Sequence, residues 1–127
     1  MKHKIHKVKI RGGKDANDML MRKLAVNFLQ HGHLTTTHAK AKLMKSFIDK
    51  LLHKVTEDTQ ANKRAVYSII QNKEMLNRLY TGMNEDMKNI KGSFLRLTRG
   101  KIRTSDAAQM VKVTYAHEFL KPLVVEE

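Results

Sequence analysis

The chain contains no cysteine and no tryptophan, and it has a single proline, Pro122. Without cysteine it can form neither a disulfide framework nor a thiolate metal site, which fits a reducing compartment. No run of about 18 apolar residues occurs, so we expect no membrane span. Residues 1–4 lack the apolar segment of a secretory signal. With three Tyr and four Phe, a base-stacking platform for single strands is not expected.

Acidic residues are also scarce. There are 12 Asp and Glu against 25 Lys and Arg, which gives a net charge of +13 and an isoelectric point near 10.1. Self-repulsion of this charge would destabilise the folded chain unless a polyanion neutralised it. Nucleic acid is therefore the first candidate partner, and an anionic membrane surface is the second.

The positive charge is densest at the N-terminus, where no acid precedes Asp15. Ile5, Val8 and Ile10 are too thinly spaced for a core, and Gly12-Gly13 loosens the junction with the next segment of the chain. The composition predicts that residues 1–14 form a basic extended tail, disordered in the free protein and ordered on a polyanion.

Apolar residues recur at helical spacing through most of the remaining chain. Asp15 is the expected N-cap of the first helix, and Gly32 is expected to end it in a left-handed conformation. Gly82 is expected to end the last helix, and 83–92 is expected to be a loop. The predicted helices span residues 15–31, 38–55, 60–71 and 73–81.

Three stretches read as strands: the extended residues 34–36, the alternating residues 94–98 and the β-branched residues 110–115. Their order along the chain predicts an α+β fold with about four helices packed on a small three-stranded mixed sheet. We expect one globular domain over residues 15–116, followed by a C-terminal tail over 117–127. The pattern does not predict the strand order.

The corner between the first two helices concentrates polar groups. Thr36 or Thr37 can cap the second helix with its hydroxyl, and Lys40 and Lys42 fall within the first two turns. Two lysines there oppose the helix dipole, so the arrangement is more favourable if an anion lies close by.

Other residues that could support chemistry are not arranged for it. His31 and His33 have no Cys or carboxylate at zinc-site spacing, so no metal site is expected. Gly12-Gly13-Lys14 lacks the spacing of a phosphate loop, and Glu57-Asp58 and Glu85-Asp86 lie in expected turns. We therefore expect no catalytic residue, no cofactor and no small-molecule substrate.

Several motifs resemble a known family. Residues 31–42, HGHLTTTHAKAK, resemble the signature His-x-x-(apolar)-x-Thr-Thr-x-x-Lys-Ala-Lys of bacterial-type large-subunit ribosomal protein L17. Residues 1–4 are similar to its Met-Arg-His-Arg start, 61–64 to its Ala-Asn-Arg-Arg, and 92–96 to its Gly-Gly-Tyr-Thr-Arg. Residues 103–110 resemble its Arg-x-Gly-Asp-x-Ala-Pro-Met.

The resemblance implies a structural protein of the large ribosomal subunit, with an α+β fold and no catalytic residues. Its implied partners are large-subunit rRNA near the nascent-chain exit region and neighbouring ribosomal proteins. Bacterial cytoplasm and mitochondrial matrix both remain open as its compartment. The candidate RNA-binding residues are Lys2, His3, Lys4, Lys7, Lys9, Arg11, Lys14, Arg22, His31, Thr36, Thr37, Lys40, Lys42, Lys63, Arg64, Arg96 and Arg103.

Other interpretations compete with this one. A free nucleic-acid-binding regulator could use the first two helices as a helix-turn-helix, but the outer face of the second helix is nearly all Lys and lacks base-reading Asn, Gln or Arg. A membrane-surface or protein-partner module would need apolar anchors that the tail lacks. Individual lysines elsewhere could simply solvate helix faces.

Overall fold

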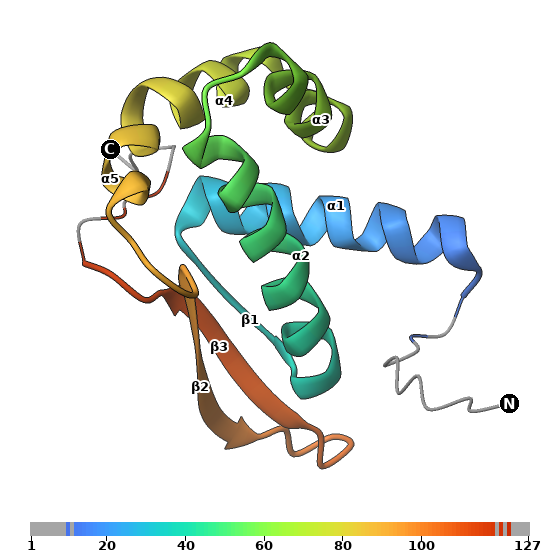
Figure 1. Ribbon diagram of the computed structural model, residues 1–127. Helices are drawn as coiled ribbons and strands as arrows, with labels where there is room; N and C mark the ends of the chain where they lie inside the picture. Colours follow the sequence, from blue (N-terminus) through green and yellow to red (C-terminus); the bar gives the residue numbers. More distant parts are fainter. Residues whose placement is uncertain (1–9, 11, 119, 121, 123–127) are drawn as a thin grey trace, which may run out of the picture.

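The computed structural model describes Ile10, residues 12–118, Leu120 and Pro122, so most of the basic tail lies outside the described residues. The predicted α+β class is confirmed (Figure 1). The elements are α1 (Lys14–His31), β1 (His33–Thr37), α2 (His38–Thr56), α3 (Gln60–Ile70), α4 (Lys73–Arg78), the π-helical turn η1 (Leu79–Met83), α5 (Asn84–Lys88), β2 (Leu95–Ile102) and β3 (Gln109–Tyr115).

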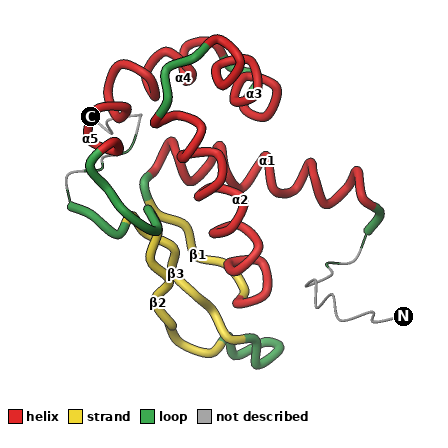
Figure 2. Tube along the Cα trace, viewed as in Figure 1, coloured by secondary structure: helices red, strands yellow, loops and turns green. Residues whose placement is uncertain are grey.

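The three strands form one sheet in the order β1-β3-β2, with β3 in the centre. Both pairings are antiparallel, so the expectation of a mixed sheet was wrong. A short connection forces β2 and β3 to run in opposite directions. The helices between β1 and β2 return the chain so that β3 is also antiparallel to β1. The helices lie above and to one side of the sheet (Figure 2).

The corner between α1 and α2 forms largely as predicted. Gly32 ends α1 with φ 77°, and its N–H donates to the carbonyl of Phe28 at 2.7 Å. Thr37 is the N-cap residue of α2, but its hydroxyl makes no capping hydrogen bond. Asp15 is not the N-cap of α1, because the N-cap is Gly13 and the helix begins at Lys14. Its carboxylate lies instead in the first turn, where its negative charge interacts favourably with the positive end of the helix dipole.

Strand β1 itself separates α1 from α2. A helix-turn-helix joins its two helices by a turn of roughly 3–4 residues. Here the connection is a five-residue strand that pairs with β3 from His33 to Thr37. The two helices are therefore positioned by the sheet, and the structure does not support the helix-turn-helix interpretation.

The helical segment after α3 continues past its predicted end. Gly82 does not stop it, because α4, η1 and α5 follow one another without a break as far as Lys88, inside the predicted loop. Met83 and Met87 are buried there, and this packing outweighs the poor helix propensity of glycine. The Asn84 side-chain amide donates to the carbonyls of Val55 and Thr56, which satisfies the last turn of α2.

The core lies between the helices and the inner face of the sheet. Phe28 of α1 and Ile48 and Leu52 of α2 are fully buried, as is Val113 of β3. Leu95 also faces this core, and strand alternation turns the side chain of Arg96 to solvent. Among the helices that the structure describes, none has both the length and the hydrophobicity needed to cross a bilayer.

Asp49 fixes the start of β2 against α2. Its two carboxylate oxygens accept hydrogen bonds from the Ser93 hydroxyl at 2.8 Å and from the Phe94 backbone N–H at 3.1 Å. Phe94 is fully buried and its ring lies edge-on to His53, with 4.7 Å between ring centroids. This acid on a lysine-rich helix thus joins two segments that are far apart in the sequence.

Replacing Asp49 by Ala should lower the free energy of unfolding by about 1–3 kcal/mol, because the Phe94 N–H and the Ser93 hydroxyl lose their acceptor. Urea denaturation of the two proteins measures this difference. Asp18→Ala, at an exposed position of α1, serves as the control, with an expected change within about 0.5 kcal/mol. Equal losses in both variants would contradict the proposed anchoring role of Asp49.

Candidate nucleic-acid interface

Among the described residues, helix α2 covers one face of the sheet, where Val111 and Val113 are buried, and no helix covers the other face. The register places Thr35 of β1, Lys112 of β3 and Thr98 of β2 in one row across the strands, and all three are exposed. The adjacent row holds His33, Thr114 and Arg96. We call these six positions the open sheet face.

The open sheet face is rich in hydrogen-bond donors and has no carboxylate. Neighbouring side chains in a row are about 5 Å apart, so several of them can reach one stretch of a ligand backbone. Within the described part of the chain, Arg96 and Lys112 form no ion pair. The face therefore offers uncompensated positive charge beside hydroxyl groups, which suits the phosphates and sugars of a nucleic acid.

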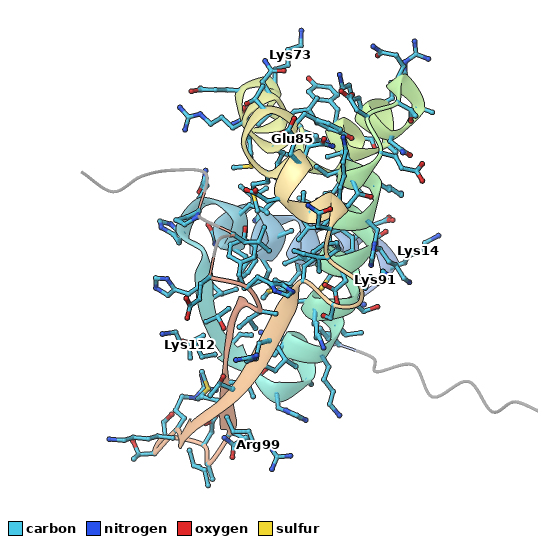
Figure 3. The ribbon with its side chains drawn as sticks, turned by 60° about the vertical axis from the view of Figure 1, so that its left-hand side comes forward. Lys14, Lys73, Glu85, Lys91, Arg99 and Lys112 are labelled. Carbon is cyan, nitrogen blue, oxygen red and sulfur yellow. The ribbon has the colours of Figure 1, made fainter. Side chains whose placement is uncertain are left out.

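Beyond Thr98, the β2–β3 hairpin extends away from the helices (Figure 1). Arg99, Gly100, Lys101 and Ile102 are all exposed, and the Ile102 side chain is 60% accessible. Neither face of this part of the hairpin is covered, so its cations can be approached from both sides. Figure 3 shows Arg99 near the end of the molecule that is opposite Lys73.

The side chain of Arg103, a predicted RNA contact, is paired within the hairpin. Its guanidinium donates to both carboxylate oxygens of Asp106, at 2.8 and 2.5 Å. Asp106 also accepts the Ala108 N–H at 3.2 Å, and Ala107 adopts φ 55°. The hydrogen bonds from Arg103 and then Ala108 lower the pKa of Asp106 to about 2, and the same pairing raises the pKa of Arg103. Arg103 therefore closes the hairpin turn.

The N-terminus of α2 lies where the sheet ends. The row Thr36–Val111–Arg99 brings Arg99 to the same end of the sheet, although it is far from α2 in the sequence. The first turn of α2 contains no acid; Lys40 is half-buried and Lys42 is exposed. Of the predicted residues, Arg96 lies in the open sheet face itself, whereas Thr36 pairs with the buried Val111 and lies on the opposite face.

The exposed side of α2, a helix that packs against the inner face of the sheet, carries further cations. A shallow groove of about 360 Å³ is lined by Lys42, Lys45, Lys50 and His53, with Ser46 and Asp49. The Asp49 carboxylate accepts hydrogen bonds from Ser93 and Phe94, and within the described residues it forms no ion pair with these lysines. Lys45 and Lys50 were absent from the candidate set, although their helical spacing from Lys42 was available as a signal.

The remaining candidates do not converge on this surface. Arg22 lines a groove between α1 and α3, and Arg64 is exposed on α3. The Lys63 ammonium lies 2.8 Å from Asp58 and 5.2 Å from the centroid of the Tyr80 ring. Lys14 and His31 are exposed at the two ends of α1. Lys2, His3, Lys4, Lys7, Lys9 and Arg11 lie outside the described residues.

Potential metal ligands are scattered over the fold. In residues 12–118 and the other described positions, no three His, Cys, Asp or Glu side chains are grouped so that they could hold a metal ion. The polar surface that the fold does assemble consists of cations and hydroxyls. That combination binds anions through hydrogen bonds and charge.

Replacing Arg103 by Gln should raise the pKa of Asp106 from about 2 toward its ordinary value of 3.8, because its main hydrogen-bond donor is lost. A lowered pKa means that the ionised carboxylate stabilises the turn above pH 3.8, and that this contribution is lost as the pH falls through about 2. NMR titration of the Asp106 side-chain carboxyl carbon measures this pKa in both proteins. Lys101→Gln removes a nearby charge that does not contact Asp106 and should leave the pKa in place; an equal rise in both variants would refute the pairing.

Comparison with known families matches residues 20–116 to the family described as Ribosomal protein L17. Three relatives are each named large ribosomal subunit protein bL17. The one from Cutibacterium acnes is 31% identical over 112 residues, covering 87% of this chain and 63% of that relative. The one from Campylobacter concisus is 28% identical over 118 residues, covering 93% of this chain and 100% of the relative. The one from Thermotoga maritima is 28% identical, covering 87% and 90%.

The family match begins in α1 and runs through the end of β3, so it includes the α1–β1–α2 corner, the open sheet face and the hairpin. Since it covers well over half of the chain, the chain belongs to the ribosomal protein L17 family.

Proposed function

We propose that this chain is a structural constituent of the large ribosomal subunit, where it binds and stabilises large-subunit rRNA near the exit-tunnel region. The proposal is supported by family membership and by the names of the relatives, which are large-subunit proteins. The chain acts by binding and is not an enzyme. Its partners are rRNA and neighbouring ribosomal proteins, and it needs no cofactor and no small-molecule substrate.

The observation that carries the proposal is the open sheet face. Arg96 and Lys112 hold positive charge on a rigid, uncovered surface that has no acid, and hydroxyls lie between them. Because the strands are already ordered, only the charged side chains lose conformational entropy when they bind phosphate oxygens. Such contacts position a protein on RNA and make the affinity depend on salt.

We assign the other contacts by their chemistry. Lys40, Lys42, Thr36 and Thr37 are proposed to contact RNA at the start of α2, where the backbone N–H groups favour an anion. By strand alternation Thr37 shares the face of Lys112, whereas Thr36 pairs with the buried Val111 and lies on the other face. Arg22, Lys63, Arg64, Lys14 and His31 are proposed as contacts of other surfaces. Arg103, which also supports the hairpin, is proposed as an RNA contact beside the exposed cations Arg99 and Lys101.

The proposed domain organisation rests on these assignments. Residues 1–14 form the RNA-binding tail, 15–116 form the globular domain, and 117–127 form the C-terminal tail. In the tail, Lys2, His3, Lys4, Lys7, Lys9 and Arg11 are proposed to neutralise phosphates that otherwise repel one another.

In its source cells, the chain should sediment with the large ribosomal subunit and stay there at moderate salt, because many phosphate contacts act together. Sucrose-gradient fractions probed for this chain measure the distribution. A free regulator would remain mainly in soluble or DNA-bound fractions, and that distribution would refute the ribosomal proposal.

The double variant Arg96→Gln/Lys112→Gln should bind deproteinised large-subunit rRNA more weakly, with a salt slope smaller by about 1 for each lost phosphate contact. Filter binding at several salt concentrations gives both quantities. Lys88→Gln/Lys91→Gln removes the same charge from exposed positions outside the open sheet face and should change the slope less. Equal slopes in the two double variants would contradict the role of the open sheet face.

A further inference from the structure

A second cationic area lies on α3 and α4, away from the open sheet face. It is a groove of about 310 Å³, and none of the described residues that line it is acidic. We call it the α3–α4 groove. Lys73, at one side of it, lies at the end of the molecule opposite Arg99 (Figure 3). Its lining includes Gln60, Lys63, Arg64, Tyr67, Lys73 and Asn77.

The charges in the α3–α4 groove are not all equally available. Lys63 is held by Asp58 at 2.8 Å. Glu74, the acid next to Lys73, accepts a hydrogen bond from Arg78 at 2.6 Å. Within the described residues, Arg64 and Lys73 have no ion-pair partner. These two side chains therefore carry the uncompensated positive charge of the groove.

Tyr67 is the feature that distinguishes this groove from an ordinary basic surface. Its side chain is 39% exposed and takes no part in the buried core, although aromatic rings usually gain more from burial. It lies one turn after Arg64 on the same face of α3. Its backbone carbonyl accepts the Gln71 N–H at 2.8 Å, which closes the end of the helix, so its backbone is fixed.

This combination matches the chemistry of a nucleotide. An aromatic ring stacks on a base, cations bind its phosphate, and the amides of Gln60 and Asn77 can both donate to and accept from a base edge. An acidic peptide would use the cations but would leave the exposed ring without a partner. A paired helix would keep its bases stacked within the duplex and out of reach.

We propose that the α3–α4 groove binds one unpaired nucleotide of RNA, with the base stacked on Tyr67 and the phosphate held by Arg64 and Lys73. The inference rests on the proposed function, since the RNA is large-subunit rRNA. One ring accepts one base, so this site is distinct from the multi-base platform that the low aromatic content argues against. The nucleotide comes from a loop or bulge, where bases are free to unstack.

Two substitutions in the full chain separate stacking from general packing. Tyr67→Leu should raise the Kd for deproteinised large-subunit rRNA by about 5- to 150-fold, the range for loss of one stacked base. Tyr67→Phe keeps the ring and should stay within about twofold of the unmodified chain. Unchanged affinity in Tyr67→Leu, or an equal loss in both variants, would overturn the proposal.

Salt dependence supplies a second readout. Tyr67→Leu removes no charge and should leave the salt slope unchanged, whereas Lys73→Gln should lower it by about 1. Lys88→Gln, an exposed lysine on α5 outside the groove, is the matched control for charge. Thermal melting checks that each variant is folded. We expect the Tyr67 variants to fold, because the Tyr67 side chain is exposed and not part of the core.

Ultraviolet crosslinking tests the contact in the assembled particle. Irradiation of the large subunit should yield a nucleotide adduct on the tryptic peptide of residues 65–73, because a stacked base touches the ring. A crosslink from this peptide to another protein, with no nucleotide adduct, would overturn the proposal. If the unmodified chain fails to bind rRNA or to sediment with the subunit, the proposed function itself fails; if only the Tyr67 results fail, the nucleotide site alone is wrong.

Discussion

The alternation of side chains along β3 is the constraint on which the arrangement depends. As the central strand, β3 pairs with β1 on one side and with β2 on the other. Val111 and Val113 complete the core against α2, and this forces Lys112 and Thr114 onto the opposite face. A slip of one residue would bury the lysine and expose both valines. The core and the cationic surface are therefore specified by the same register.

This arrangement also explains how the chain tolerates its charge. The core is built from apolar residues, with Asn84 as a buried polar side chain whose amide is hydrogen-bonded. The cations remain at the surface, where water screens them and each costs little alone. Their sum still opposes folding, so a bound polyanion would stabilise the chain as well as being held by it. Binding and stability are in this sense linked.

The sequence predicted those features of the fold that depend on neighbouring residues, such as helix ends and strands. Gly32 ends α1 because a left-handed residue is needed there, and β-branched residues form β3. The local pattern was insufficient where tertiary packing decides, since buried Met83 and Met87 carry the helix through Gly82. The pairing of Arg103 with Asp106, three positions along the chain, has a local cause that the sequence reading did not use. Tyr67 was missed because only the packing of α3 beside α4 shows that its ring is left exposed.

The open sheet face and the α3–α4 groove are far enough apart to bind two different segments of RNA. The open sheet face belongs to the sheet, whereas the α3–α4 groove belongs to helices at the other end of the molecule (Figure 3). One continuous RNA strand bound along the sheet would leave Arg64 and Lys73 uncompensated. If both areas bind RNA, they hold separate segments at a distance fixed by α2 and its packing against α3 and the sheet. A rigid spacer between segments that repel each other would stabilise their arrangement, which is the work of a structural ribosomal protein.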